Sequence, residues 1–232
     1  GSLYEKNGDY AHALEAYEIV AQRSPDNFDA QARVVHTLLS LNRGKDAQTR
    51  ALAAVRTFKA SDESIELLRE VYRRNGNEPG VVPALRQIYQ ERPKDHAILF
   101  ALTNTLDSLG KTSDAEAMLR DAFEKNEGQN FDIAHRLVAM YLKHDQAPRA
   151  ALLLVELSAK EPDLTSQIGE LWDDILHASG PHHFRLADLQ KLEVPPGCEP
   201  AKLYWVSRIA LINGRNTLAN TTLEKSTTLQ PI

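Results

Sequence analysis

The sequence predicts an all-α fold in which about seven helix-turn-helix units stack into an α-solenoid. Four prolines stand 68, 69 and 69 residues apart, at Pro25, Pro93, Pro162 and Pro231. Half of that interval, 34 or 35 residues, is the step of an alanine ladder formed by Ala13, Ala47, Ala115, Ala150 and Ala219. Val81 fills the third rung, and the rung near Arg185 is unclear. A fixed period of about 20 to 50 residues indicates a repeat fold, in which each unit buries its apolar face against its neighbours.

One domain is expected over residues 1–232, because a solenoid is a continuous stack. Its expected units are 1–27 (partial), 28–61, 62–95, 96–130, 131–165, 166–199 (degenerate) and 200–232. The fourth unit shows the pattern clearly, since apolar residues follow helical spacing on both sides of a break at Gly110. Each period therefore predicts two amphipathic helices joined by a short turn.

Two units depart from this pattern. The second has Lys59 where the closing proline would stand. The sixth is degenerate: its second helix, expected over Phe184 to Leu192, is short and carries Arg185 at the alanine rung. A proline-rich loop, residues 195–200, follows it in place of a tight turn.

Turn signals separate the helices. A glycine just after a helix end favours the left-handed conformation that glycine adopts at little cost, and this is expected at Gly8, Gly76, Gly110 and Gly214. Between units, Pro25, Pro93 and Pro162 each stop a helix, and nearby Asp or Asn residues can cap the next.

The first unit resembles the tetratricopeptide repeat family. The residues that carry the resemblance are Gly1, Tyr4, Gly8-Asp9-Tyr10, Ala13, Tyr17 and Pro25, and the segment from Lys6 to Leu14 is typical of the family. Weaker matches extend over nearly the whole chain. The resemblance implies 34-residue helix hairpins in a right-handed superhelix, whose first helices line a concave groove that binds protein segments.

The composition excludes some classes of function. The 27 Lys and Arg against 32 Asp and Glu give a formal net charge of −5, which lacks the positive excess that nucleic-acid binding uses. No apolar run reaches the length of a membrane span, and no secretory signal pattern opens the chain. We therefore expect a soluble segment that binds no nucleic acid, either cytoplasmic or bacterial periplasmic.

No pattern of residues predicts catalysis, a metal or a cofactor. The adjacent His182 and His183 lack the i, i+4 spacing of metal-binding helices. Glu63, Glu66 and Glu70 share a helix face, but nothing in the sequence separates their pKa values as an acid/base pair requires. Cys198 is expected to be an incidental loop or packing residue. The chain is thus expected not to be an enzyme.

The candidate partner-binding residues follow from the groove that the resemblance implies. They are Arg33, His36, Phe100, Asn104, His135, Arg136, Tyr204, Trp205 and Arg208. Glu66, Glu70, Glu170 and Asp174 occupy inner positions of the same first helices. Aromatic and arginine side chains dominate binding energy at many interfaces, although Phe100 and Trp205 have the alternative of packing between hairpins.

The sequence thus predicts a non-catalytic scaffold that holds a protein or peptide of unknown identity in its groove. An alternative, which the resemblance allows, is the repeat region of a larger protein, such as a bacterial exopolysaccharide export component or a repeat-containing transferase. The chain begins inside a first helix and stops at a closing proline, which favours a fragment or self-association through the terminal repeats.

Overall fold

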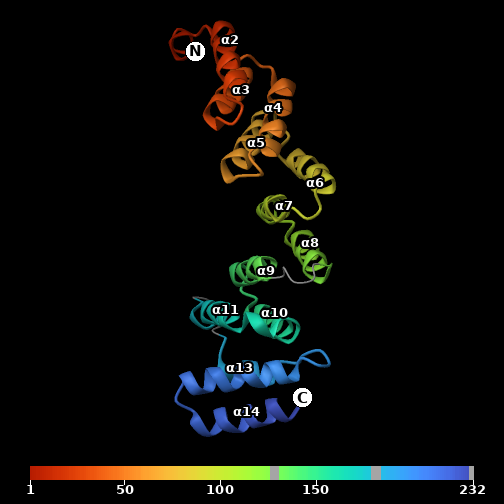
Figure 1. The fold of residues 1–232 in the computed structure, drawn as a ribbon. Helices are drawn as coiled ribbons and strands as arrows, with labels where there is room; N and C mark the ends of the chain where they lie inside the picture. Colours follow the sequence, from red (N-terminus) through yellow and green to blue (C-terminus); the bar gives the residue numbers. More distant parts are fainter. Residues whose placement is uncertain (126–130, 179–183, 230–232) are drawn as a thin grey trace. The chain divides into compact units, whose positions relative to one another are not determined.

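The computed structural model of the chain describes residues 1–125, 131–178 and 184–229. Within these residues it has fourteen α-helices, two short 3-10 helices and no strand, which confirms the predicted all-α fold (Figure 1). Gly180, the pair His182-His183 and Pro231 lie outside the described residues.

The first helices of the hairpins begin at a nearly constant interval. After the short α1 (Ser2–Lys6), they are α3 (Phe28–Ser40), α5 (Asp62–Arg74), α7 (His96–Ser108), α9 (Phe131–Lys143), α11 (Thr165–His177) and α13 (Glu199–Ile212). From α3 to α13 their first residues are 34, 34, 35, 34 and 34 positions apart. The helix-hairpin repeat that the sequence predicts is therefore present in the structure.

The second helices vary more in length. They are α2 (Tyr10–Arg23), α4 (Gly44–Thr57), α6 (Val81–Glu91), α8 (Thr112–Lys125), α10 (Ala147–Lys160), α12 (Leu186–Lys191) and α14 (Asn216–Leu229). Two 3-10 helices, η1 (Glu78–Gly80) and η2 (Pro162–Leu164), precede α6 and α11. Five second helices have 14 residues, whereas α6 has 11 and α12 has 6.

The chain divides into two compact parts, which we call the N-terminal part (Gly1–Met118) and the C-terminal part (Leu119–Ile232). In the N-terminal part, consecutive helices from α2 to α5 pack on one another, and α6 packs on α7. In the C-terminal part, α10 packs on α9 and α11, and α13 contacts α10, α12 and α14. The pair α13 and α14 lies side by side along its length (Figure 1). Each of the two parts is a stack of helix hairpins. A single right-handed superhelix that runs through both parts remains a prediction.

The alanine ladder lies in the core. Ala13, Ala47, Ala115 and Ala150 are fully buried, and Val81 and Ala219 are at most 3% exposed. Small side chains at these rungs let the two helices of a hairpin approach closely, and interiors packed this tightly leave no room for larger ones. The rung near Arg185 is different, because Arg185 is exposed and stands just before α12. The second helix of the sixth unit is thus even shorter than the sequence predicts.

A left-handed residue recurs at the turn within the hairpins. The four predicted glycines have φ between 70° and 75°. Asn42 and Asp145 occupy the equivalent positions in the second and fifth units, with φ of 57° and 58°. Asn and Asp are the side chains that tolerate this conformation best after glycine. The turn geometry is therefore constant although the residue type changes.

The boundaries between units use the predicted caps in part. Asn27 and Asp95 accept hydrogen bonds from backbone N–H groups of the helices that they precede. At the boundary between the second and third units, where no proline stands, Lys59 and Ala60 both have positive φ, and Ser61 then caps α5. A left-handed pair therefore replaces proline as the helix stop at this position.

Candidate functional site

In the N-terminal part, the first helices of three successive hairpins present polar side chains at the same position along the repeat. His36 on α3, Glu70 on α5 and Asn104 on α7 stand 34 residues apart, at the same position of successive helices. His36 and Asn104 are exposed and Glu70 is half-buried, whereas the neighbouring Val35 and Leu38 are buried. The helices thus turn their apolar sides to the core and this polar row outward. We call His36, Glu70 and Asn104 the polar row.

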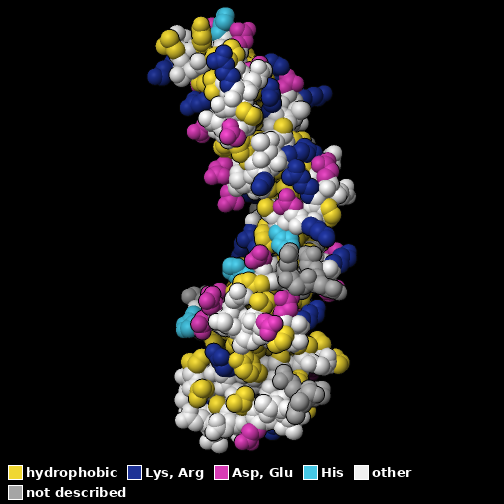
Figure 2. Space-filling view, viewed as in Figure 1, with side chains coloured by type: hydrophobic (Ala, Val, Ile, Leu, Met, Phe, Trp, Pro, Cys, Tyr) yellow, Lys and Arg dark blue, Asp and Glu magenta, His cyan; other side chains and the backbone are white. Residues whose placement is uncertain are grey.

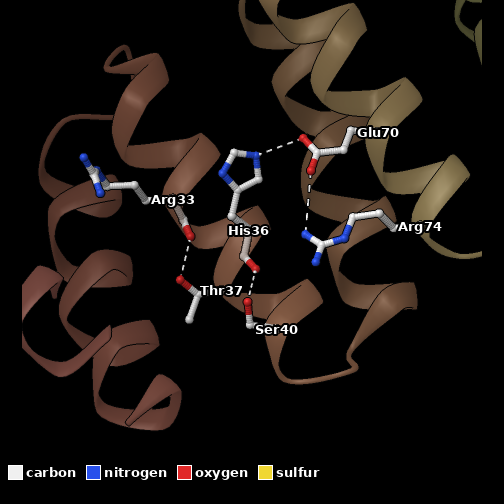
Figure 3. A network of polar contacts seen from close by, with 6 residues as sticks. All are labelled: Arg33, His36, Thr37, Ser40, Glu70 and Arg74. Carbon is white, nitrogen blue, oxygen red and sulfur yellow. Dashed lines mark hydrogen bonds and ion pairs between the residues drawn. The ribbon is translucent and has the colours of Figure 1, made fainter. Parts of the chain in front are cut away.

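Glu70 connects two helices of this row. Its Oε2 lies 3.3 Å from Nε2 of His36, and its Oε1 lies 3.6 Å from Nη1 of Arg74 (Figure 3). The side chains of His36 and Glu70 are 46% and 30% exposed. An exposed pair of this kind contributes only about 0–1 kcal/mol to stability. The pair places the Glu70 carboxylate between α3 and α5.

A second polar contact joins α5 to α7. Arg69 donates a hydrogen bond from Nη2 to Oγ of Ser108 at 2.6 Å, and its Nη1 lies 4.0 Å from Oε2 of Glu66. Ser40, Arg74 and Ser108 form another set of positions 34 residues apart. Sequence reasoning missed Arg69, Arg74 and Ser108, although the constant repeat length places the last two beside the polar row.

Arg33 belongs to a different cluster. Its side chain points away from His36 (Figure 3), and its Nη1 donates a hydrogen bond to the Tyr17 hydroxyl at 3.4 Å. Tyr17 in turn donates to Oε2 of Glu5 at 2.8 Å. Burial raises the pKa of Tyr17, and the hydrogen bond to Glu5 raises it further. Arg33 therefore links α3 to α2 and does not join the polar row.

Phe100 lies one turn before Asn104 on α7. Its ring is half-buried, with its centroid 5.9 Å from that of His96 in a tilted arrangement. Asn104 is exposed, and its amide offers both a donor and an acceptor. Together, Phe100 and Asn104 place an apolar ring and an amide on one face of α7.

The C-terminal part carries the other predicted partner-binding residues. On α9, His135 is exposed and stacks on Phe131 with ring centroids 6.4 Å apart, while Arg136 is half-buried. On α11, Glu170 and Asp174 are exposed, and acidic side chains gather on this helix (Figure 2). The first helices α9 and α11 of the C-terminal part therefore expose both acidic and imidazole side chains.

On α13, Tyr204 and Arg208 form one pair, and Trp205 has a separate role. Arg208 donates from Nη1 to the Tyr204 hydroxyl at 3.0 Å. Trp205 is 2% exposed, its centroid lies 5.7 Å from that of Trp172, and its Nε1 donates to Oγ of Ser158 at 2.7 Å. Trp205 thus packs between helices, which is the alternative that the sequence left open, and we leave it out of the partner-binding set.

The described residues include no cluster of metal ligands, and their cysteine, Cys198, has a raised pKa. Residues 1–125, 131–178 and 184–229 contain no cluster of three His, Cys, Asp or Glu side chains that could hold a metal ion. Burial, together with the nearby Glu156, raises the pKa of the Cys198 thiol against the opposing effect of Lys160. A raised pKa disfavours the thiolate, which is the reactive form. No described helix is long and apolar enough to cross a membrane.

Comparison with known proteins adds a likeness in fold. No protein-family model and no curated protein matches the sequence. Among solved structures, the chain is similar to a tetratricopeptide repeat protein from Parabacteroides merdae. The match has 13% sequence identity and a TM-score of 0.37, and it covers 98% of this chain and 90% of that chain.

Proposed function

We propose that the chain is a non-catalytic scaffold that binds a segment of a partner protein on the first-helix faces of its units. The observation that carries this proposal is the polar row, in which three helices of constant spacing present His36, Glu70 and Asn104 on one outward face. A face built at this constant spacing suits an extended or helical segment, because a segment that runs across the helices meets one polar side chain from each of them.

The contacts within this face favour binding. Glu70 lies 3.3 Å from His36 and 3.6 Å from Arg74, so contacts within the chain favour its rotamer before a partner binds. Binding orders side chains at a cost of about 0.5–1.5 kcal/mol for each immobilised rotamer-rich residue, and a pre-ordered residue avoids most of that cost. Asn104 can exchange hydrogen bonds with a partner backbone, and Phe100 adds an apolar surface beside it.

We expect Glu70→Arg to weaken partner binding at least about tenfold, which corresponds to roughly 1.4 kcal/mol. The substitution reverses the charge and separates His36 from its partner. Glu70 is half-buried and its contacts with His36 and Arg74 are worth about 0–1 kcal/mol each, so the unfolding free energy should fall by no more than about 2 kcal/mol. The measurement is recovery of partner from the native host by a photo-reactive amino acid at Ser40, which is exposed one turn after His36 on α3, with and without the Glu70 change.

The matched control places the photo-reactive amino acid at Thr49, which is exposed on the second helix α4. Recovery of one partner from position 40 and not from position 49, lost on Glu70→Arg, would support the proposal. Equal recovery from both positions, or recovery unaffected by the charge reversal, would remove the polar row as the binding face.

Self-association is a second candidate, and exposed apolar side chains of the first and last hairpins favour it. Leu3 and Ile19 in the first hairpin are 71% and 51% exposed, and Leu211 and Ile212 in the last are 59% and 73% exposed. Hydrophobic side chains are visible over α13 and α14 (Figure 2). We expect light scattering to show a mass that rises with concentration and falls on Ile212→Asp. A constant monomer mass at high concentration would exclude this candidate.

A further inference from the structure

Three of the hairpin turns contain the same dipeptide, asparagine followed by glycine. They are Asn7-Gly8, Asn75-Gly76 and Asn213-Gly214, and all three asparagines are exposed. Their backbones agree closely: the asparagines have φ between −88° and −82° and ψ between 2° and 11°, and the glycines have φ of 70° or 75°. The three turns thus form a matched set, in which the surroundings of each turn determine how readily it reacts.

Asparagine followed by glycine can react without an enzyme. The glycine amide nitrogen attacks Cγ of the asparagine side chain, since glycine has no side chain to shield that nitrogen. A bond forms between this nitrogen and Cγ, the bond from Cγ to Nδ2 breaks, and Nδ2 leaves as ammonia with the proton of the glycine N–H. Water then opens the cyclic imide at either carbonyl and leaves aspartate or isoaspartate. The reaction, deamidation, needs no reactant other than water.

The folded turn opposes deamidation in all three places. The glycine N–H groups are occupied, because Gly8, Gly76 and Gly214 each donate at 3.0 Å to the carbonyl three residues earlier. The ψ angles near zero place the glycine nitrogen away from Cβ of the asparagine, whereas ring closure requires both on the same side of the Cα–C bond. Deamidation therefore requires a local opening, in which the end of the preceding helix releases the glycine and ψ rotates.

The side chains of Asn75 and Asn213 are restrained by hydrogen bonds. Asn213 donates from Nδ2 to the Ile209 carbonyl at 2.9 Å, and Asn75 donates from Nδ2 to the Gly44 carbonyl at 3.1 Å. The second contact depends on the glycine at position 44, because a Cβ there would lie 2.3 Å from Oδ1 of Asn75. Within the described residues, no group binds the side-chain amide of Asn7. This amide can therefore rotate toward the glycine that follows it.

The helices that precede the turns differ as well. Val71 and Tyr72, near the end of α5, are buried, and so are Ile209 and Ala210, near the end of α13. Opening either of these ends displaces core side chains. Helix α1 has five residues and buries none of them. Opening the end of α1 thus exposes less apolar surface and costs less free energy.

We propose that Asn7 is a site of spontaneous deamidation in the folded chain and that the fold protects Asn75 and Asn213. The product adds a negative charge to the turn before α2, where Asp9 already caps that helix by accepting from the His12 N–H at 3.2 Å. Isoaspartate also adds one carbon to the backbone of this turn, so the modification loosens the packing of α1 on α2. The proposal concerns the turns alone and does not depend on the scaffold function.

The experiment follows deamidation of the purified full chain in mildly alkaline buffer, by rapid digestion and mass spectrometry of all three sites in one sample. We expect Asn7 to deamidate at least about tenfold faster than Asn75 and Asn213. In concentrated urea, which opens all three turns, the three rates should become comparable. The denatured sample thus controls for the intrinsic reactivity of each dipeptide.

A variant tests the cause of protection at Asn75. Gly44→Ala places a Cβ where the Asn75 amide lies, so we expect the rate at Asn75 to rise at least about fivefold and the rate at Asn213 to stay unchanged. Helix content measured by circular dichroism should be kept, since alanine favours a helix. An unchanged rate at Asn75 would exclude the side-chain hydrogen bond as its protection.

Two results would overturn the proposal for Asn7. The first is a rate at Asn7 no higher than those at Asn75 and Asn213 in the folded chain. The second is a tenfold preference for Asn7 that persists in urea, because the preference would then come from the neighbouring residues in the sequence and not from the fold.

Discussion

Replacing Trp205 by alanine is expected to lower the unfolding free energy of the chain by about 3–5 kcal/mol, the usual cost of deleting a buried aromatic side chain. Trp205 is 2% exposed and packs against Trp172 with ring centroids 5.7 Å apart. The substitution removes this contact and leaves a large void between α13 and α10. Urea unfolding followed by circular dichroism measures the change.

Trp205→Phe is the matched control, because it keeps a ring and removes the hydrogen bond from Nε1 to Ser158. The Ser158 hydroxyl still donates to the Leu154 carbonyl at 2.7 Å. We therefore expect a smaller loss, about 1–2 kcal/mol. A Trp205→Ala chain as stable as the unmodified one would contradict the packing of α13 described above.

Trp205 also shows where sequence reasoning about the site stops. Its residue type suggested a binding anchor, but α13 is apolar on most of its circumference: Val206, Ile209 and Ala210 are buried, while Leu211 and Ile212 are exposed. A helix of this composition has no clear polar side, so periodicity could not tell which ring faces solvent. On α3 the apolar residues keep more to one side of the helix, and His36 is exposed on another side.

The fold could be predicted from the sequence more fully than the binding site, because the repeat length determines where the helices begin and end. The spacing of prolines and alanines predicted the hairpins, and the turn glycines predicted the left-handed positions. Asn42 and Asp145 were missed because they are not glycines, although their spacing of 34 and 35 residues from Gly8 and Gly110 marks them. Constant position along the repeat is thus a better guide than residue type.

Pairing between side chains could not be read from the sequence. The contact between His36 and Glu70 joins residues on different helices, and so does the bond from Arg69 to Ser108. Such contacts depend on rotamers and on the angle between helices, which spacing alone does not give.

Arg120→Ala is expected to lower the unfolding free energy of the C-terminal part by about 2 kcal/mol. This value is within the range of about 1–3 kcal/mol for a charged group, here the Glu156 carboxylate, that loses its partner. Arg120 on α8 donates from Nη1 to Oε2 of Glu156 on α10 at 2.8 Å and from Nε to the Tyr141 hydroxyl on α9 at 3.2 Å. Burial alone would lower the pKa of Arg120, but the hydrogen bonds to Glu156 and Tyr141 raise it. The guanidinium is therefore charged and joins three helices.

Arg56→Ala is the matched control, since Arg56 pairs with Glu91 across two second helices at 3.1 Å but with side chains 34% and 44% exposed. The side chains of Arg120 and Glu156 are 24% and 19% exposed, so solvent screens their attraction less. We expect Arg56→Ala to cost about 0–1 kcal/mol. A double-mutant cycle of Arg120→Ala with Glu156→Ala should give a coupling of about 1–2 kcal/mol. A coupling near zero would mean that Arg120 contributes through packing of its alkyl chain and not through the ion pair.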